Sequence, residues 1–280
     1  MDRSFIENNL VAGVYTNSDK YFKQFTDNWQ GHYADVELIF NIQKGKINEN
    51  MEKLRHKFIE TGKRYWLFMD EDILFTRNDV IETCLKYMKK NDLDLITTYQ
   101  STDFNLVKKV KADGLPFEYI TWCAGYFMLV DSKRCGLVPF DLDLPTTHGS
   151  MSDLAYCMDI IEDADALIGI APTMIYHADS GYSPKVIEPF KITKENKENV
   201  NKSVSQFLKE LDPKLLYGNP KIEIVFLGNG DIDYNETIGG HYLKNKHPNI
   251  YHEIVARHHY DIVHTNKKDN FTFTKDKNTV

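Results

Sequence analysis

The sequence predicts an α/β fold with a mostly parallel sheet flanked by helices and a small C-terminal extension. Short apolar runs bounded by turn-forming residues alternate with amphipathic segments over residues 10–98. That alternation is typical of a doubly wound parallel sheet. One run, at 65–69, ends in three consecutive acids, Asp70, Glu71 and Asp72. A hydrophobic content of 42% over 280 residues is enough for the core of one large α/β domain.

Each predicted strand is an apolar run too short for a helix, and each predicted helix repeats apolar residues every three or four positions. The helix around Met51, Leu54 and Phe58 has this spacing and ends at Gly62, a residue that commonly closes helices. The predicted strands cover residues 10–15, 36–42, 65–69 and 93–98, and the predicted helices between them cover residues 19–29, 48–61 and 79–88.

Beyond residue 100 the alternation is less regular. Residues 119–130 are apolar but are interrupted at Gly125 and its two preceding neighbours, and a loop rich in turn-forming residues follows at 139–150. A helix is predicted at 153–161 and a strand at 166–176. The main domain is therefore expected to continue well past the regular first half.

The expected domain boundary lies near residue 190. Residues 1–190 are predicted to form the main domain, and residues 191–280 a mixed, partly helical extension. The extension contains a highly charged helical pattern at 193–211 and one good strand pattern at 222–227.

Composition narrows the class of protein. The formal net charge of −7 argues against a broad basic surface for nucleic acid or for an anionic membrane. The four cysteines lie far apart without a Cys-x-x-Cys pair, which indicates reduced thiols rather than a disulfide framework or a zinc site. Because the chain also opens without an apolar signal segment and contains no run long enough to span a bilayer, the sequence predicts a cytoplasmic protein.

The acids after the third predicted strand are the strongest functional signal. Side chains of a strand alternate between faces, so Asp70 and Asp72 are expected on one side and Glu71 on the other. Open α/β sheets hold their ligands at the carboxyl ends of strands, where two carboxylates suit a hard divalent cation that also binds a diphosphate. The alternative is a strand end closed by solvated acids, and an isolated Asp-x-Asp does not decide between the two.

Further features occur in order along residues 8–180 and form a pattern with these acids. They are Asp70-Glu71-Asp72 after a βαβαβ start, Gly125 in an apolar stretch, Pro139-Phe140-Asp141 followed by Ser152-Asp153-Leu154, and His177 after a late strand. In this order they resemble the motifs of GT-A-fold glycosyltransferases, most closely those of the inverting family 2.

The resemblance implies a GT-A fold and a metal-dependent glycosyltransferase of the hexosyltransferase type. Such an enzyme moves a sugar from a nucleoside diphosphate sugar, here a UDP-sugar by preference, to an acceptor hydroxyl. It implies that Mn²⁺ or Mg²⁺ is held by Asp72 and His177, with Asp70 ranked after them. Asp153 becomes the general base of an inverting transfer, although the acid that precedes it in the family is Ser152 here. The alternative is that Ser152 and Asp153 only cap the following helix.

The resemblance also implies a set of donor-binding residues. The aspartate that binds the nucleotide base after the second strand in the family is missing, and Asn41 or Gln43 occupies its neighbourhood. Trp122 suits stacking on a sugar ring, with a core position as the equal alternative. The residues expected to contact the donor are Thr16, Asn17, Asn41, Gln43, Arg55, Asp70, Glu71, Trp122 and Gly125.

Two other functions remain as alternatives. A nucleotidyltransferase shares the sheet and the carboxylate-held metal, but the segment 14–18 lacks the Gly-rich, basic loop expected of one. A sugar-binding domain without turnover would not need Asp70, Asp72, Asp153 and His177 together. The acceptor is not identified by the sequence, and the extension after residue 190 is expected on the acceptor side or in a homo-oligomer contact.

Overall fold

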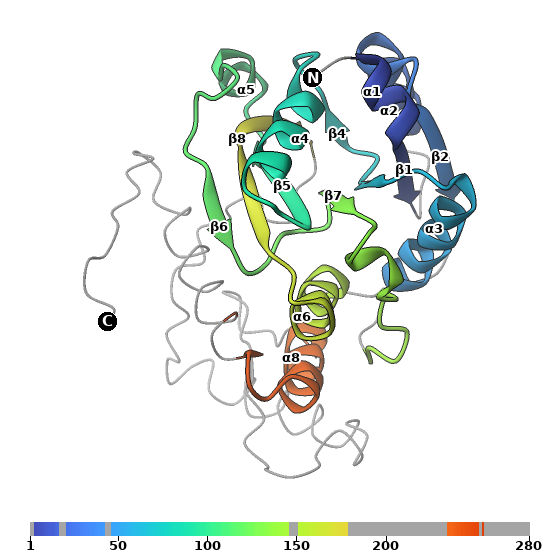
Figure 1. Ribbon diagram of the computed structural model, residues 1–280, viewed down its shortest axis with the longest axis vertical. Helices are drawn as coiled ribbons and strands as arrows, with labels where there is room; N and C mark the ends of the chain where they lie inside the picture. Colours follow the sequence, from blue (N-terminus) through green and yellow to red (C-terminus); the bar gives the residue numbers. More distant parts are fainter. Residues whose placement is uncertain are drawn as a thin grey trace, which may run out of the picture.

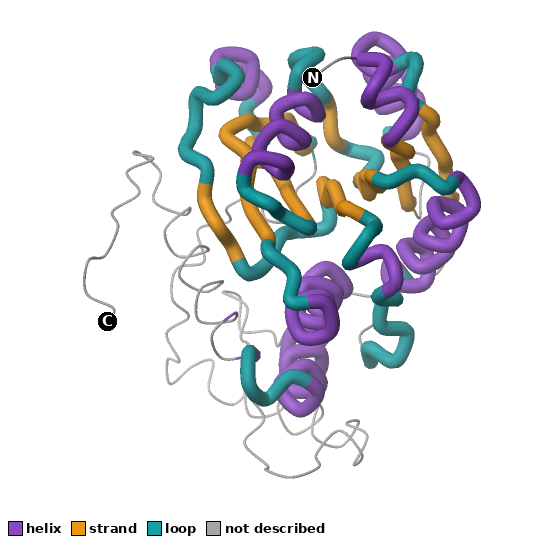
Figure 2. The backbone as a smooth tube through the Cα atoms, viewed as in Figure 1, coloured by secondary structure: helices purple, strands orange, loops and turns teal. Residues whose placement is uncertain are grey.

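The computed structural model describes residues 3–16, 21–42, 46–145, 151–178, 234–251 and 254. Helices lie on both sides of one mixed sheet, and α6 and α8 lie next to each other below it in the view of Figures 1 and 2. The strands are β1 (Leu10–Thr16), β2 (Glu37–Ile42), β3 (Tyr65–Met69), β4 (Ile73–Leu74), β5 (Leu95–Ser101), β6 (Glu118–Ile120), β7 (Phe127–Asp131) and β8 (Ile168–His177). The helices are α1 (Arg3–Asn9), α2 (Phe22–Tyr33), α3 (Ile47–Thr61), α4 (Val80–Lys90), α5 (Phe104–Lys109), α6 (Ser152–Ala164) and α8 (Tyr234–Lys246), with a 3₁₀ turn η1 at Cys135–Leu137.

The sheet has the order β2-β1-β3-β7-β5-β8-β4, and β6 also pairs with β8. The pairings make β1, β2, β3, β5 and β8 run in one direction and β4, β6 and β7 in the other. The expected mostly parallel α/β sheet is therefore confirmed, with β7 inserted antiparallel between β3 and β5.

Both faces of the sheet are buried, as a doubly wound fold requires. On β1, Leu10, Ala12 and Val14 belong to the core cluster that includes residues of α1, α2 and α4. The intervening Val11 and Tyr15 belong to the cluster that includes residues of α3 and α6. Successive strand residues thus pack into the helix layers on opposite sides of the sheet. This explains why the sequences of these strands are continuous apolar runs.

Gly13 is the exception on β1, and its lack of a side chain sets how closely α3 packs. A Cβ placed there would lie 2.4 Å from the ring carbon Cζ of Phe58 on α3. That is far inside van der Waals contact, so only glycine lets the Phe58 ring lie directly on the strand.

Element boundaries differ from the expected ones where side-chain packing extends an element. The predicted helix at 19–29 is observed as Phe22–Tyr33, because Tyr33 at its end is fully buried. The apolar stretch 119–130 is divided into β6 and β7, and the short helices α1 and α5 were not predicted. The expected helix at 193–211 and strand at 222–227 lie outside the described residues.

Helix α8, from the predicted extension, packs on α6. Leu243, Tyr251 and Ile254 share a buried cluster with Leu154 and Met158 of α6. Ion pairs surround that cluster: the Lys246 Nζ lies 2.7 Å from an Asp159 oxygen and 2.8 Å from an Asp141 oxygen, and His247 Nδ1 lies 2.7 Å from Glu162. The division at residue 190 stays a prediction, but Leu243, Tyr251 and Ile254 share a core with residues of the main domain.

This contact between α8 and α6 predicts the effect of shortening one buried side chain. Leu243 is fully buried, so Leu243→Ala should lower the free energy of unfolding by about 2–5 kcal/mol. Lys244→Ala on the same helix is the matched control and should change it by less than ~0.5 kcal/mol. Chemical denaturation measures both, and equal effects would show that α8 is not docked on α6.

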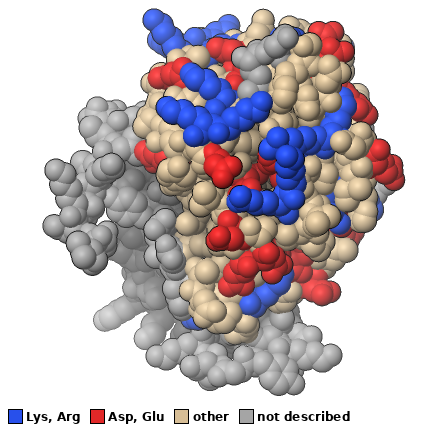
Figure 3. Space-filling view, viewed as in Figure 1, with Lys and Arg blue, Asp and Glu red and all other residues tan. Residues whose placement is uncertain are grey.

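The structure gives the distribution of charged side chains on one face and the burial of the cysteines. Figure 3 shows acidic side chains interspersed among the Lys and Arg side chains of one face, and Lys86 and Asp113 form one pair at 2.9 Å. All four cysteines are buried free thiols. Among the described residues no helix is both long and apolar enough to cross a lipid bilayer.

Candidate metal centre

The candidate centre lies where the carboxyl ends of β3 and β8 meet. Asp70 follows β3, Asp72 precedes β4, and His177 is the last residue of β8. Strand β4 pairs antiparallel with β8, with Ile73 opposite His177, and the Ala178 N–H donates to the Asp72 carbonyl at 2.9 Å. This pairing holds the acidic turn against the end of β8.

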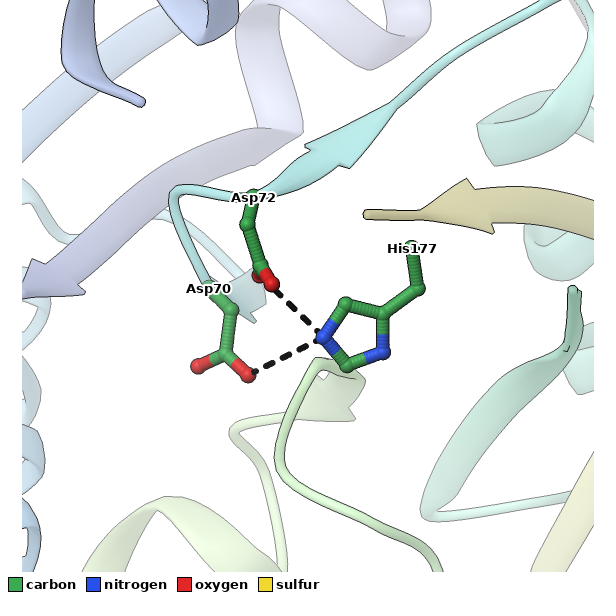
Figure 4. Close-up of side chains that lie close together, drawn as sticks. All are labelled: Asp70, Asp72 and His177. Atoms are coloured by element: carbon green, nitrogen blue, oxygen red, sulfur yellow. Dashed lines mark ion pairs between the residues drawn. The ribbon is translucent and has the colours of Figure 1, made fainter. Parts of the chain in front are cut away.

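Asp70, Asp72 and His177 direct their side chains toward one point (Figure 4). His177 Nε2 lies 3.1 Å from Asp72 Oδ1 and 3.9 Å from Asp70 Oδ2. One ligand atom from each residue falls within 4.8 Å of the others. The expectation that Asp70 and Asp72 face the same side is confirmed, but residues 70–72 leave the strand, so a turn rather than strand alternation brings the carboxylates together.

The electrostatics of this group fit a cation. Burial raises the pKa of Asp70 to about 7; the Tyr15 hydroxyl opposes this by hydrogen bonding, the Asp72 charge adds to it, and His177 opposes it. Two carboxylates this close do not both ionise readily without a positive charge between them. Two carboxylate oxygens and an imidazole nitrogen are a donor set that Mn²⁺ accepts, so the residues present fit a divalent metal.

The far side of the His177 ring is held by β5 and by the turn before β7. Its Nδ1 is hydrogen-bonded to the side-chain oxygen Oε1 of Gln100. The Tyr126 ring lies against it with ring centroids 5.2 Å apart. The His177 side chain is only 9% exposed, so its orientation is set by these neighbours.

Asp153, the expected base, lies in the first turn of α6 close to the same edge. Its Oδ2 accepts the Gly125 N–H at 2.9 Å and its Oδ1 accepts the Leu154 N–H at 2.8 Å. Burial raises its pKa, and these backbone hydrogen bonds only partly oppose the shift. Asp153 therefore satisfies a helix N-terminal N–H and also has the raised pKa that suits a proton acceptor.

Tyr15 connects Asp153 to the carboxylate pair. Its single hydroxyl hydrogen is shared between the Gly125 carbonyl, at 3.2 Å, and the Asp70 carboxylate. Gly125 is thus contacted by Tyr15 through its carbonyl and by Asp153 through its N–H. A Cβ at Gly125 would lie 2.7 Å from the Tyr15 oxygen and 3.6 Å from the Asp153 Cβ.

The crowding at Gly125 predicts the effect of Gly125→Ala. The added methyl group must displace Tyr15, and with it the hydrogen bond to Asp70, so binding of divalent metal should weaken although no ligand is changed. Isothermal titration with Mn²⁺ measures this. Gly31→Ala, where a Cβ would meet nothing within 4 Å, is the matched control. Unchanged Mn²⁺ affinity in Gly125→Ala would contradict the role given to this contact.

Two predicted donor-binding residues have structural partners. Arg55 is buried, with two guanidinium nitrogens on the Glu52 carboxylate at 2.7 and 2.8 Å and a third on the Gly136 carbonyl at 2.8 Å. The buried Asn41 amide donates to the backbone and side-chain oxygens of Asn50 at 3.2 Å. Both side chains thus form hydrogen bonds to other residues of the fold. Donor binding by Arg55 or Asn41 stays a prediction.

The remaining predicted donor residues stay untested. Thr16 ends β1 at the same edge as Asp70, and Glu71 lies in the acidic turn but is not part of the three-residue group. Trp122 is partly buried and packs against two hydrophobic clusters, one that includes residues of α3 and one that includes residues of α8. Asn17 and Gln43 lie outside the described residues.

Sequence reasoning missed Tyr15 and Gln100. Tyr15 falls in the apolar run of the predicted strand 10–15, and the signal for it is a hydroxyl at the end of a buried strand. Gln100 lies beyond the predicted strand 93–98, whereas β5 continues to Ser101. A polar side chain following an apolar run, as in the acidic turn, was the signal there too.

Comparisons with known proteins give likeness of fold at low identity. No family model matches the chain, and no curated protein matches it as a relative. Among solved structures, A197 from STIV is 12% identical with a TM-score of 0.43, covering 60% of this chain and 85% of its own. The S. aureus protein TarS, residues 1–349, in complex with UDP is 11% identical with a TM-score of 0.44, covering 85% and 92%.

A third match is a mannosyltransferase, PcManGT from Pyrobaculum calidifontis, in complex with GDP-Man and Mn²⁺. It is 12% identical with a TM-score of 0.41, and the match covers 90% of this chain and 75% of that protein. PcManGT is a mannosyltransferase by its name, and none of these three structures singles out the inverting family 2. Identities this low and TM-scores below 0.5 leave function to be argued from the side chains of the centre.

Proposed function

We propose that this protein is a metal-dependent glycosyltransferase that moves a sugar from a nucleoside diphosphate sugar to an acceptor hydroxyl. The observation that carries the proposal is the convergence of Asp70, Asp72 and His177 at the carboxyl edge of the sheet. The partly buried carboxylate of Asp153 is joined to them through Gly125 and Tyr15. A cation site and a separate proton acceptor are the two groups that such a transfer needs.

Asp70, Asp72 and His177 would hold Mn²⁺ or Mg²⁺. When bound, the cation would neutralise negative charge that develops on the diphosphate leaving group. Tyr15 would keep the Asp70 carboxylate oriented toward the centre through its hydroxyl. Asp72 and His177 are nearly buried and the Asp70 side chain is 28% exposed, so water around the centre is restricted and the charge interactions there are stronger than in bulk water.

Asp153 would act as the general base. It would accept the proton of the acceptor hydroxyl while that oxygen forms its bond to the anomeric carbon and the bond from that carbon to the diphosphate oxygen breaks. The Gly125 N–H would hold Oδ2 in place during this step. Attack from the face opposite the leaving diphosphate inverts the anomeric configuration, which is the stereochemical outcome we propose.

A donor screen tests the proposal. Nucleoside diphosphate sugars, beginning with UDP-hexoses, would be incubated with the full chain and Mn²⁺, and release of the nucleoside diphosphate would be followed with and without a chelator. We expect chelator-sensitive release from one class of donor. Formation of pyrophosphate from a nucleoside triphosphate and a sugar phosphate would instead identify a nucleotidyltransferase, and metal-dependent donor binding without release would identify a binding domain.

A further inference from the structure

A shift of register in the sheet brings Gln100 next to His177. Strands β5 and β8 pair in parallel with Thr98 opposite Ala171, but the next residue, Tyr99, is opposite Met174. The shift occurs at Pro172, a residue that cannot donate a backbone hydrogen bond to a ladder. Continued pairing would place Gln100 opposite Thr173; the shift places it opposite Ile175, two residues before His177.

The resulting hydrogen bond determines which ring nitrogen carries hydrogen. The Oε1 atom of Gln100 can only accept, so its hydrogen bond to His177 Nδ1 requires the hydrogen to be on Nδ1. In the neutral ring Nε2 then carries the lone pair. Nε2 is the atom that faces Asp72 at 3.1 Å and Asp70 at 3.9 Å.

Neighbouring side chains also hold the His177 ring in this orientation. The Tyr126 ring covers one side of it, and the Tyr126 hydroxyl is itself fixed by donation to the Thr98 carbonyl on β5. Without Gln100, the two carboxylates beside Nε2 would favour hydrogen on that nitrogen, which would remove it as a metal ligand.

We propose that Gln100 is the positioning residue of the metal centre, holding His177 in the tautomer that offers Nε2 to a divalent cation together with Asp70 and Asp72. This inference rests on the proposed function, because it names how the cation site of that function is prepared. A metal-bound histidine often donates its second N–H to a carboxylate. Here the acceptor is the neutral amide of Gln100. Gln100 therefore orients the ligand without adding a third negative charge to the site.

The test uses Mn²⁺ alone with the full chain and no sugar donor. Gln100→Leu should weaken Mn²⁺ binding by roughly 10–100-fold, the usual effect of losing an outer partner of a metal-bound histidine. Pulsed electron paramagnetic resonance should detect an imidazole nitrogen bound to Mn²⁺ in the wild-type protein and a weakened or missing signal in Gln100→Leu. His177→Ala supplies the reference without that nitrogen, and Tyr99→Phe, on the same strand, should match wild type in both measurements.

Gln100→Glu keeps the test decisive if Gln100→Leu does not fold. Its carboxylate can accept the same Nδ1–H more strongly, so the nitrogen signal should persist and Mn²⁺ should bind more tightly than to wild type. Two outcomes would overturn the inference about Gln100 without affecting the proposed metal centre. One is wild-type Mn²⁺ affinity with an unchanged nitrogen signal in folded Gln100→Leu. The other is loss of the nitrogen signal in Gln100→Glu. Absence of Mn²⁺ binding in the wild-type protein would overturn the proposed metal centre together with it.

Discussion

Asp153→Asn should reduce sugar transfer roughly 10²–10⁴-fold, the usual cost of losing a general base, while nucleoside diphosphate binding with Mn²⁺ persists. Asparagine has nearly the same size and keeps one oxygen that can accept the Gly125 or Leu154 N–H, but it cannot take up a proton. Single-turnover transfer assays and calorimetry with a nucleoside diphosphate separate the two effects.

The pH dependence of transfer gives an independent reading of the same residue. Burial raises the pKa of Asp153 above the ordinary value for an aspartate, and only the unprotonated form can act as base. Transfer by the wild-type protein should therefore fall as the pH drops through that raised pKa, and this acidic limb should be absent from the residual activity of Asp153→Asn.

Asp163→Asn is the matched control, since Asp163 is exposed on the same helix. It removes the same charge from α6 without touching the centre, and its transfer rate should equal that of wild type. Near-normal transfer in Asp153→Asn would mean that Asp153 serves only the helix end, and that the base lies elsewhere.

Asp72→Asn should remove most Mn²⁺-dependent nucleotide binding. Asp72 is 9% exposed and its Oδ1 lies 3.1 Å from His177 Nε2, so the substitution deletes one of two negative charges at a buried point. We expect a loss of Mn²⁺ affinity beyond the roughly 100-fold that marks the upper end for outer-shell partners, measured by calorimetry with Mn²⁺ alone and then with a nucleoside diphosphate.

Asp27→Asn controls for the general loss of charge, because the Asp27 side chain is 65% exposed on α2 and pairs only with Lys23 among the contacts described. It should leave Mn²⁺ affinity unchanged. A folded Asp72→Asn variant that binds Mn²⁺ as tightly as Asp27→Asn would remove Asp72 from the centre.

Much of the candidate centre could be predicted because its parts are local. The acidic turn is recognisable in the sequence as three charged residues directly after a buried apolar run. His177 is recognisable by its position after a late strand. A strand that is buried on both faces is apolar throughout, so a polar residue at its end is conspicuous. Apart from the short elements α1 and β4, the order of strands and helices before residue 100 was predictable for the same reason.

The contacts that join these parts depend on pairing between distant segments. Nothing near Gln100 in the sequence indicates that a shift at Pro172, more than seventy residues later, will place it beside His177. The Tyr15 hydroxyl reaches Asp70 and Gly125 only because β1 and β3 are neighbours and the turn before β7 returns to the same edge.

The sequence by itself determined the α/β class, the main strands, and the residue types of a candidate cation site at a strand end. Those properties follow from local polarity and periodicity, which each segment carries within itself. The tertiary structure alone decided that Asp70 and Asp72 converge through a turn, that α8 packs on the helix bearing Asp153, and that Gln100 and Tyr15 contact residues of the candidate centre. These contacts arise from sheet register and close packing, which depend on residues far apart in the chain and leave no pattern in any one segment.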